Sequence, residues 1–421
     1  MDSLSYWADT SERKLSFLDR PLPESVDCAI IGGGMTGISA AYHMASEGLN
    51  VALLEREYLG WGASSRNGGM AIPGIKHKVA TLFKQHGMEA TRRMFNASFE
   101  SVELLKRLIT EKEIDCDLQE TGSFAAAYRP SHFKSLEKWQ RTLADDFGHS
   151  TRLVPPERMK EELGTDRYYG GLVDETSIGL HPAKFMLGMV RCADEAGASL
   201  HEKAAADDIR RTAEGFEVGT ARGSVRAKEV LIATNGYTGD LTPELRRRVI
   251  PLGSYIIVTE PLDGALADQI IPNRRMIYDT KNVLYYFRIL PDNRMMFGGR
   301  VSFTPTNSHR SGKLLRKGML SLFPELDHVR VEYSWGGLLG MSFDRMAHTG
   351  QMDGMHYSMG YSGRGFSMAA YLGKKMAAVI AGKSDSTPFS DLRFRTMILY
   401  RKRPWFMPLA GAFYRFKDMV S

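Results

Sequence analysis

The sequence has few cysteines and no apolar run long enough to cross a membrane. Only three of its 421 residues are cysteines, Cys28, Cys116 and Cys192. Three cysteines far apart provide neither a disulfide framework nor a metal site, and they suit a reducing compartment. Residues 1–7 lack the basic start and the apolar core of a signal peptide. We therefore expect a cytoplasmic location, no transmembrane segment and no bound metal.

Acidic residues are scarce in one segment only, the C-terminal tail. The net charge is +6, and residues 391–421 supply most of it with seven basic and two acidic side chains. A nucleic-acid groove needs basic residues spread along a face of the fold, so the near-neutral body argues against nucleic-acid binding. The tail mixes basic and aromatic residues, which fits a membrane surface or a subunit partner. We favour the simpler interpretation, a terminal segment packed on the body with solvated charges.

Residues 28–57, CAIIGGGMTGISAAYHMASEGLNVALLERE, combine a glycine-rich turn with an acid at a characteristic distance. An apolar run precedes Gly32, Gly34 and Gly37, which match G-x-G-x-x-G, and a helical stretch follows them. A second apolar run ends at Glu55, about 20 residues beyond the glycines. Strand, glycines, helix, strand and acid in this order predict a dinucleotide site.

Each part of this pattern has a physical role. Gly32 permits a sharp turn, Gly34 lets backbone N–H groups approach a pyrophosphate, and Gly37 lets helix and strand pack closely. The N-terminus of the helix carries a partial positive charge that suits phosphates. The Glu55 carboxylate can accept hydrogen bonds from ribose hydroxyls.

The rest of the chain alternates helices with short strands. The patterns predict helices within 84–113 and over 182–196 and 366–380, a hairpin and a buried strand within 215–237, and short strands through 251–303. A chain of 421 residues should form two domains, or one large domain with insertions. Parallel αβ units flank mainly antiparallel segments, which predicts an α+β domain inserted into a nucleotide-binding α/β domain.

Several segments resemble the D-amino-acid-oxidase superfamily of FAD-dependent oxidoreductases, in the same order along the chain. Besides the glycine fingerprint they are GWGASSRNGGM (60–70), GLHPAKFMLGMVRCADEAGASLHE (179–202), VLIATNGY (230–237), NVLYYFRILPDNRMMFGG (282–299) and GYSGRGFSMAAYLGKKMAAVI (360–380). Within the superfamily the sequence is most similar to the gamma-glutamylputrescine oxidase group, through GWGASSRNGG and the tail segment RPWFMP. The resemblance covers nearly the whole chain.

This resemblance implies FAD rather than NAD, and a Rossmann-like FAD-binding domain of the glutathione-reductase type. That domain is expected to be discontinuous, over 1–80, 175–240 and 335–421. The inserted, mainly antiparallel substrate-binding domain is expected over 81–174 and 241–334.

FAD lies extended in such folds, so distant segments converge on it. Matching the family's segments implies that the cofactor is bound by Gly32, Gly34, Met35, Thr36, Gly37, Glu55, Arg56, Ser64, Ser65, Arg66, Asn67, Gly68, Gly69, Ala206, Thr234, Asn235, Gly236, Gly363, Arg364, Gly365 and Phe366.

Two departures from the family pattern affect this expectation. Sarcosine-oxidase-like members attach FAD through a cysteine in the stretch that resembles residues 333–348, and this sequence has no cysteine there. We therefore expect non-covalent FAD. Those members also place a lysine over the flavin, where this sequence has Met295 and Met296. This weakens the expectation of a fast oxidase and leaves a dehydrogenase with a quinone-type acceptor open.

The implied reaction needs no side-chain nucleophile. A neutral amine gives a hydride to the flavin, the resulting imine hydrolyses, and oxygen reoxidises the flavin. The sequence has no Ser-His-Asp spacing and no His/Cys cluster. His43 and His181 stand alone and are expected to be structural. His348 is the best exception, because it lies in the segment that the resemblance turns toward the flavin.

Tyr286 and Arg288 alternate on one predicted strand, so their side chains should share a face. In the superfamily this sheet roofs the active site, and an Arg with a Tyr there usually holds a substrate carboxylate. The resemblance therefore implies that Arg288 anchors the substrate, since a guanidinium can fork two hydrogen bonds onto a carboxylate. The alternative is that Arg288 pairs with an internal acid such as Asp279 or Asp344.

Together these observations predict an enzyme that oxidises the C–N bond of a small amine or amino acid, gamma-glutamylputrescine-like or N-substituted. The alternatives are an amino-acid dehydrogenase, a flavin enzyme acting on a tRNA base, and an electron-carrying flavoprotein without amine turnover. The sequence specifies neither the amine, nor the electron acceptor, nor the oligomeric state.

Overall fold

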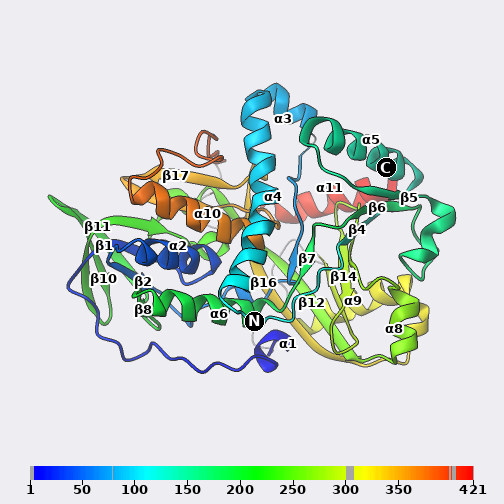
Figure 1. Ribbon diagram of the computed structural model, residues 1–421, viewed down its shortest axis with the longest axis horizontal. Helices are drawn as coiled ribbons and strands as arrows, with labels where there is room; N and C mark the ends of the chain where they lie inside the picture. Colours follow the sequence, from blue (N-terminus) through cyan, green and yellow to red (C-terminus); the bar gives the residue numbers. More distant parts are fainter. Residues whose placement is uncertain (1–3, 78, 300–307, 398–399, 401–403, 421) are drawn as a thin grey trace.

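Two eight-stranded sheets organise the protein. The structure, a computed structural model, describes residues 4–77, 79–299, 308–397, 400 and 404–420. Figure 1 shows the first sheet with its helices on the left, the second sheet on the right, and the long helix α4 (Met88–Glu111) standing between them.

The first sheet follows from the fingerprint. Its strands are β1 (Ser25–Ile31), β2 (Val51–Leu54), β8 (Ser199–His201), β9 (Ala206–Thr212), β10 (Gly215–Thr220), β11 (Gly223–Ile232), β17 (His348–Met352) and β18 (Met355–Met359). The order is β17-β18-β11-β1-β2-β8, with β10 paired to β11 and β9 to β10. The central strand β1 is parallel to both β11 and β2. Its apolar run is continuous because Cys28 and Ile30 enter one hydrophobic core while Ala29 and Ile31 enter another.

Three helices pack together beside this sheet and meet at short distances. They are α2 (Met35–Ser46), α6 (Pro182–Glu195) and α10 (Gly365–Ile380). Helix α2 begins directly after the fingerprint glycines and contacts both of the others. A Cβ atom at Gly373 would lie 2.5 Å from the Thr36 carbonyl oxygen, so the approach of α10 to α2 requires glycine there. This contact brings the start of α10 beside the fingerprint.

The second sheet is almost wholly antiparallel. Its strands are β4 (Ser123–Ala126), β5 (Arg152–Val154), β6 (Gly171–Asp174), β12 (Val249–Pro261), β13 (Met276–Asp279), β14 (Tyr285–Ile289), β15 (Arg294–Gly299) and β16 (Val331–Ser342). The order is β16-β12-β15-β14-β13-β4-β6-β5, and β13 with β4 is the parallel pair among them. Helix α9 (Ser308–Leu322) packs on β12 and β16 and buries Leu315 against a core that contains Phe287 and Phe297.

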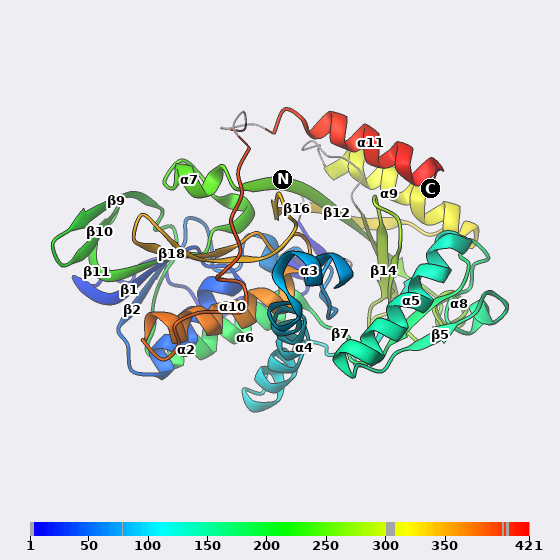
Figure 2. The same ribbon diagram turned by 90° about the horizontal axis from the view of Figure 1, so that it is seen from above.

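The remaining elements are short or peripheral. They are α1 (Tyr6–Asp9), α3 (Val79–His86), α5 (Pro130–Phe147), α7 (Pro243–Arg246), α8 (Gly264–Ile270), α11 (Met407–Val420), β3 (Met70–Ala71), β7 (Ile178–Gly179) and the 3-10 turns η1 (Ala63–Ser65), η2 (Pro156–Glu161), η3 (Asn235–Tyr237) and η4 (Pro324–Leu326). Figure 2 shows α11 along the upper edge of the molecule. Within the described ranges, no helix is both long and apolar enough to span a bilayer.

The predicted fold class is confirmed: a Rossmann-like α/β part carries an inserted, mainly antiparallel part. The helices predicted over 182–196 and 366–380 are α6 and α10, and the stretch 84–113 holds the end of α3 and all of α4. The last residues of the predicted strand region, 300–303, lie outside the described residues.

The domain boundaries stay a prediction, and two elements bear on them. Helix α4 lies within 81–174, yet it packs on α10 and shares the core of the first sheet's helices. Strand β16 begins at Val331 and pairs along its length with β12, so the second sheet extends past the expected boundary at 335.

Candidate functional site

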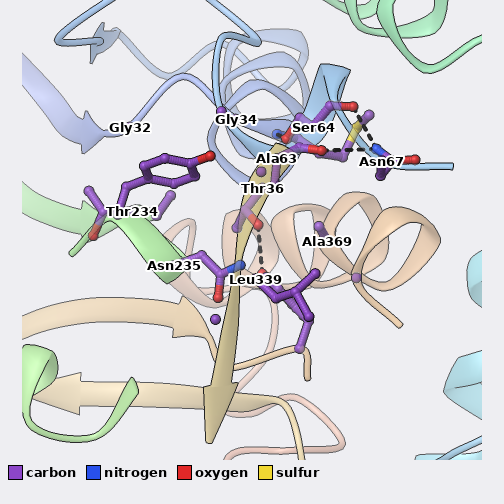
Figure 3. A pocket seen from close by; sticks show the side chains of 18 of the residues that line it. Gly32, Gly34, Thr36, Ala63, Ser64, Asn67, Thr234, Asn235, Leu339 and Ala369 are labelled. Carbon is purple, nitrogen blue, oxygen red and sulfur yellow. Dashed lines mark hydrogen bonds between the residues drawn. The ribbon is translucent and has the colours of Figure 1, made fainter. Parts of the chain in front are cut away.

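A cavity of about 520 Å³ is lined by residues of both sheets. The first sheet contributes the ends of β1, β2 and β11, and the second contributes residues of β12, β13, β14 and β16. Figure 3 shows Gly32, Gly34, Thr36, Ser64, Asn67, Thr234, Asn235 and Leu339 around one space. Segments more than 300 residues apart in the chain therefore line one cavity.

The fingerprint glycines lie where the backbone turns sharply or packs closely. Gly32 has φ +110°, a backbone conformation that side chains disfavour, and an added Cβ would lie 3.0 Å from the Ala233 carbonyl oxygen. An added Cβ at Gly37 would lie 2.0 Å from the carbonyl oxygen of Gly32, so no other residue fits there. Gly34 lines the cavity at the start of α2. Gly34 is the N-cap residue of α2 and has no side chain that could bond to the first N–H groups of the helix. The N-terminus of a helix without such a cap is suited to bind phosphate.

Glu55 ties the end of β2 to the fingerprint loop. One carboxylate oxygen accepts a 2.7 Å hydrogen bond from the backbone N–H of Gly33, and the other accepts a 2.8 Å bond from that of Glu57. Burial raises the pKa of the Glu55 carboxyl, while these two N–H donors oppose the shift. Each oxygen retains acceptor capacity, so the carboxylate can still receive hydroxyl donors from the cavity.

The loop 60–70 is held in one conformation by hydrogen bonds. The Ser64 hydroxyl accepts from the backbone N–H of Met35 at 2.8 Å, which joins this loop to the start of α2. The Asn67 amide donates to the carbonyls of Ala63 and Ser64 and accepts from the Gly69 N–H. Because the Asn67 side chain is used within the loop, its role is to shape the wall.

Thr234 and Asn235 close another side of the cavity. Asn235 has φ +43°, and its side-chain oxygen accepts a 3.0 Å hydrogen bond from the Gly360 N–H. This bond joins the end of β11 to the turn before α10. Gly236 lies behind the wall, where an added Cβ would meet the backbone of Leu339 at 2.8 Å.

The N-terminus of α10 forms a positively charged corner of the cavity. Gly363, Arg364, Gly365 and Phe366 all line it. The Arg364 guanidinium donates to the carbonyls of Ile72 and Pro73 and lies 5.9 Å from the centroid of the Tyr278 ring. An added Cβ at Gly363 would lie 3.0 Å from the Lys76 ammonium, so a second cation lines the cavity beside this turn.

Most of the predicted site residues line this cavity, and six do not. The lining residues are Gly32, Gly34, Met35, Thr36, Glu55, Arg56, Ser64, Arg66, Asn67, Gly68, Ala206, Thr234, Asn235, Tyr286, Gly363, Arg364, Gly365 and Phe366. The six others are Gly37, Ser65, Gly69, Gly236, Arg288 and His348. Gly37, Gly236 and Gly69 allow close packing of the backbone. An added Cβ at Gly69 would lie 2.0 Å from the Leu180 carbonyl oxygen. The Ser65 hydroxyl lies against the backbone of its own loop, 2.8 Å from where a Cβ at Gly60 would stand.

Arg288 does not face the cavity, which corrects the expectation that it shares an accessible face with Tyr286. Its side chain is buried, and its guanidinium donates to the Gln119 side chain at 2.9 Å and to the Leu180 carbonyl at 2.6 Å. It lies 5.7 Å from the Trp7 ring. Burial lowers the Arg288 pKa to about 10. No described carboxylate forms an ion pair with it, so the alternative pairing with Asp279 or Asp344 is wrong as well.

His348 is also a structural residue here. The side chain is fully buried, its Nε2 donates a 2.9 Å hydrogen bond to the Asp344 carboxylate, and its ring stacks on Phe394 at 4.2 Å between ring centroids. It lies at the start of β17 in the first sheet, away from the cavity lining. The segment match placed it in the wrong layer because β16 and β17 belong to different sheets.

Several lining residues were missed by the sequence reasoning. They are Trp61, Lys76, Tyr237, Ser254 and Tyr278, besides small residues of β16. Trp61 and Tyr237 pack edge to face at 5.7 Å. Tyr278 carried no motif, and only its place on β13, directly opposite Tyr286 on β14, brings it to the cavity. Nothing in the local sequence marks such a residue.

Among the residues that the structure describes, no group of three or more His, Cys, Asp or Glu side chains is arranged to hold a metal ion. The three cysteines are buried and free, and none is among the residues that line the cavity.

Comparisons with known proteins agree with this geometry. The family model DAO, described as FAD dependent oxidoreductase, matches residues 27–379. The chain is 31% identical over 388 residues to the probable oxidoreductase OrdL of Haemophilus influenzae and 31% identical over 385 residues to gamma-glutamylputrescine oxidoreductase of Escherichia coli. Each alignment covers 90% of this chain and 89% of the relative.

Solved structures show the same fold. Glycine oxidase from Geobacillus kaustophilus has a TM-score of 0.72 at 20% identity, covering 88% of this chain and 99% of that one. L-amino acid deaminase from Proteus vulgaris has a TM-score of 0.73 at 16% identity, covering 89% and 99%. With a family match over most of its length, close-packed fingerprint glycines and a cavity joining both sheets, the chain belongs to the DAO family of FAD-dependent oxidoreductases.

Proposed function

We propose that this enzyme oxidises the C–N bond of a small amine or amino acid that carries a carboxylate away from the reacting carbon. The observation that carries the proposal is one cavity that runs from a dinucleotide cradle to a corner with two cations. The relative named gamma-glutamylputrescine oxidoreductase supports a substrate of this kind.

The cradle fits FAD bound without a covalent link. Glu55 would receive the adenosine ribose, Gly34 and the start of α2 would receive the pyrophosphate, and Ser64 to Gly68 would pass the flavin ring. When bound, FAD accepts a hydride equivalent from the substrate's α-carbon. The absence of a cysteine among the described lining residues favours non-covalent attachment.

At the other end of the cavity, Arg364 and Lys76 favour an anionic group, so we assign Arg364 to the substrate and not, as the family segments had implied, to FAD. The guanidinium of Arg364 is oriented by the two backbone carbonyls of Ile72 and Pro73. The N-terminus of α10 adds its own partial positive charge. A carboxylate placed here would be held by the guanidinium and flanked by the Tyr278 phenol, which also lines the cavity.

The tyrosines of the second sheet would position the rest of the substrate. The Tyr286 hydroxyl lies 3.2 Å from the Ser254 hydroxyl, and both residues line the cavity. The Tyr286 ring lies against the loop 60–70, 3.0 Å from where a Cβ at Gly68 would stand. No histidine is among the described lining residues, so the amine would lose its proton to solvent before it reacts.

The electron acceptor is proposed to be oxygen, with a quinone-type acceptor as the second candidate. Met296 is buried behind Gly68 and Tyr286, with its methyl group 3.4 Å from where a Gly68 Cβ would stand. Sarcosine-oxidase-like members have a lysine over the flavin here, and this chain has a thioether instead. The missing positive charge favours a slow reaction of the reduced flavin with oxygen. A cytoplasmic location also stays a prediction.

Anaerobic flavin bleaching tests the proposal. The FAD-loaded protein would be titrated with a panel of polyamines, N-methyl amino acids, cyclic imino acids and D-amino acids, each carboxylate paired with its neutral amide. We expect bleaching by at least one amine and preference for the carboxylate over its amide. A panel that leaves the flavin oxidised throughout would contradict amine oxidation. Filter binding of tRNA tests the alternative that the substrate is a tRNA base, because that alternative requires the protein to retain tRNA on the filter.

A further inference from the structure

Helix α11 presents a stripe of large apolar side chains to solvent. Leu409, Phe413 and Phe416 are 69%, 61% and 58% exposed, and Trp405, just before the helix, is 56% exposed. Spacings of four and three residues place Leu409, Phe413 and Phe416 on one helical face. These are four of the twelve most exposed large apolar side chains among the described residues, gathered in one segment.

The opposite face of α11 is fixed to the body, so the stripe is held outward. Met407 is buried in a cluster with Ile250, Leu252 and Tyr400. The Asp418 carboxylate accepts hydrogen bonds of 2.8 Å from the Asn282 N–H and 2.9 Å from the Val283 N–H. A helix anchored at both ends in this way cannot turn its apolar stripe into its own chain.

The charge around the stripe is positive. The segment 391–421 contains seven basic residues against two acidic ones, and one of these acids, Asp418, is turned toward the body. Lys417, on α11 itself, is exposed, while Arg401, Lys402 and Arg403 lie outside the described residues. Helix α9, which lies below α11 on the same edge in Figure 2, has exposed Lys313 and Lys317 and no acidic residue.

We propose that α11 attaches this enzyme to the surface of an anionic lipid bilayer, with Leu409, Phe413 and Phe416 in the headgroup region and the basic residues against lipid phosphates. Aromatic and leucine side chains on one face with lysine and arginine beside them are the composition of helices that lie in a membrane interface. Basic residues near an anionic surface add attraction.

A second copy of the chain fits this surface less well. A symmetric dimer through α11 would bring the same basic segment of each protomer against the other, and like charges oppose that contact. The bilayer supplies the opposite sign. Helix α11 packs on the body through one face, as expected of the tail, and leaves its other face exposed.

The attachment would place the lipid near the cavity. Asp418 holds the backbone of Asn282 and Val283, and the next residue, Leu284, lines the cavity. The α11 edge and the substrate end of the site are thus connected by one short loop.

Vesicle sedimentation tests the proposal on the FAD-loaded full chain. The probes are vesicles of phosphatidylcholine alone and vesicles with a third of phosphatidylglycerol. We expect sedimentation with the anionic vesicles, weakening as salt rises, and at least about tenfold weaker binding for Leu409→Ser/Phe413→Ser. Met88→Ser is the matched control, since Met88 is 52% exposed on α4, away from the tail, and should bind as wild type.

Flavin content and melting temperature should be unchanged in both variants, because these side chains are exposed. Failure of the wild type to bind anionic vesicles would overturn the proposal, as would equal binding by Leu409→Ser/Phe413→Ser. Sedimentation equilibrium that finds a dimer dissociated by Leu409→Ser/Phe413→Ser would assign the stripe to a second copy instead.

Discussion

The Arg364 guanidinium lies 5.9 Å from the centroid of the Tyr278 ring, across the boundary between α10 and the second sheet. Tyr278 stands directly opposite Tyr286 in the β13–β14 pair, so the three side chains form one end of the cavity. Arg288, two residues along β14 from Tyr286, is bound to Gln119 and Leu180 instead. Arg364, at the N-terminus of α10, is therefore a cation at this end of the cavity that a substrate could reach.

Replacing Arg364 should impair substrate binding without loss of FAD. Removing one partner of a buried charged pair costs about 2–5 kcal/mol, so we expect Arg364→Ala to lower kcat/KM about 30- to 3,000-fold for a carboxylate substrate. Arg364→Lys should recover part of this, because an ammonium does not fork onto a carboxylate. The loss should be much smaller with the neutral amide of the same substrate.

Arg288→Met is the comparison for this experiment. Methionine keeps most of the side-chain volume but leaves the Leu180 carbonyl without its donor, which costs about 1–3 kcal/mol of stability. We expect a lower melting temperature and kcat/KM close to that of wild type. Loss of carboxylate selectivity in Arg288→Met rather than in Arg364→Ala would restore Arg288 as the substrate anchor.

Replacing Glu55 should weaken FAD retention. In Glu55→Ala the ribose hydroxyls lose a charged acceptor worth about 1.5–3 kcal/mol, and the Gly33 N–H loses its partner as well. Equilibrium dialysis or flavin fluorescence measures the change in Kd. Glu57→Ala is the matched control, because the Glu57 carboxylate pairs with Lys203 at the surface and is not among the lining residues. Equal FAD affinity in the two variants would remove Glu55 from the cofactor site.

Stability should fall as pH decreases from 6.5 toward 4, in part through His181. Its Nδ1 accepts a 3.2 Å hydrogen bond from the Lys184 N–H and caps α6, so the folded protein needs the neutral ring. Burial lowers the His181 pKa to about 4. The folded pKa lies below the unfolded value, so the unfolded chain takes up the proton first and stability is lost below pH 6.5.

The variant His181→Asn isolates this contribution. Asparagine also caps helices and does not titrate, so the melting temperature of the variant should change less between pH 6.5 and 4 than that of wild type. His43 and His201, whose pKa values burial likewise lowers to about 4, remain in both proteins and supply the common slope. Identical pH slopes would show that His181 contributes nothing.

Reoxidation of the reduced flavin by oxygen should be measurable but slow. Met295 and Met296 are buried on β15, so no cation is supplied from that strand position. Stopped-flow traces of the reduced enzyme mixed with aerated buffer, or with a soluble quinone, measure the two rates, and peroxide assays identify the product. Reduced flavin that persists in air but reacts at once with the quinone would make the enzyme a dehydrogenase. Met296→Lys should react faster with oxygen than Met296→Leu.

By itself, the sequence determined the parts of the protein whose interactions are local. The fingerprint specifies a strand, a turn and a helix within 30 residues, because Gly32, Gly34 and Gly37 are needed for backbone reasons that no distant partner changes. The helices α6 and α10 follow from their own apolar spacing, and the tail's charge from a count of side chains. These features could be read without the fold.

Tertiary structure alone decided which side chains share the cavity. Alternation on β14 gave Tyr286 correctly, but it did not reveal that Trp7 and Leu180 enclose Arg288, since those contacts come from residues over 100 positions away. Tyr278 and Lys76 carry no motif and reach the cavity through strand pairing and loop packing. The exposed face of α11 was likewise undecided, because burial depends on which neighbours pack against a helix, and only the fold brings those neighbours together.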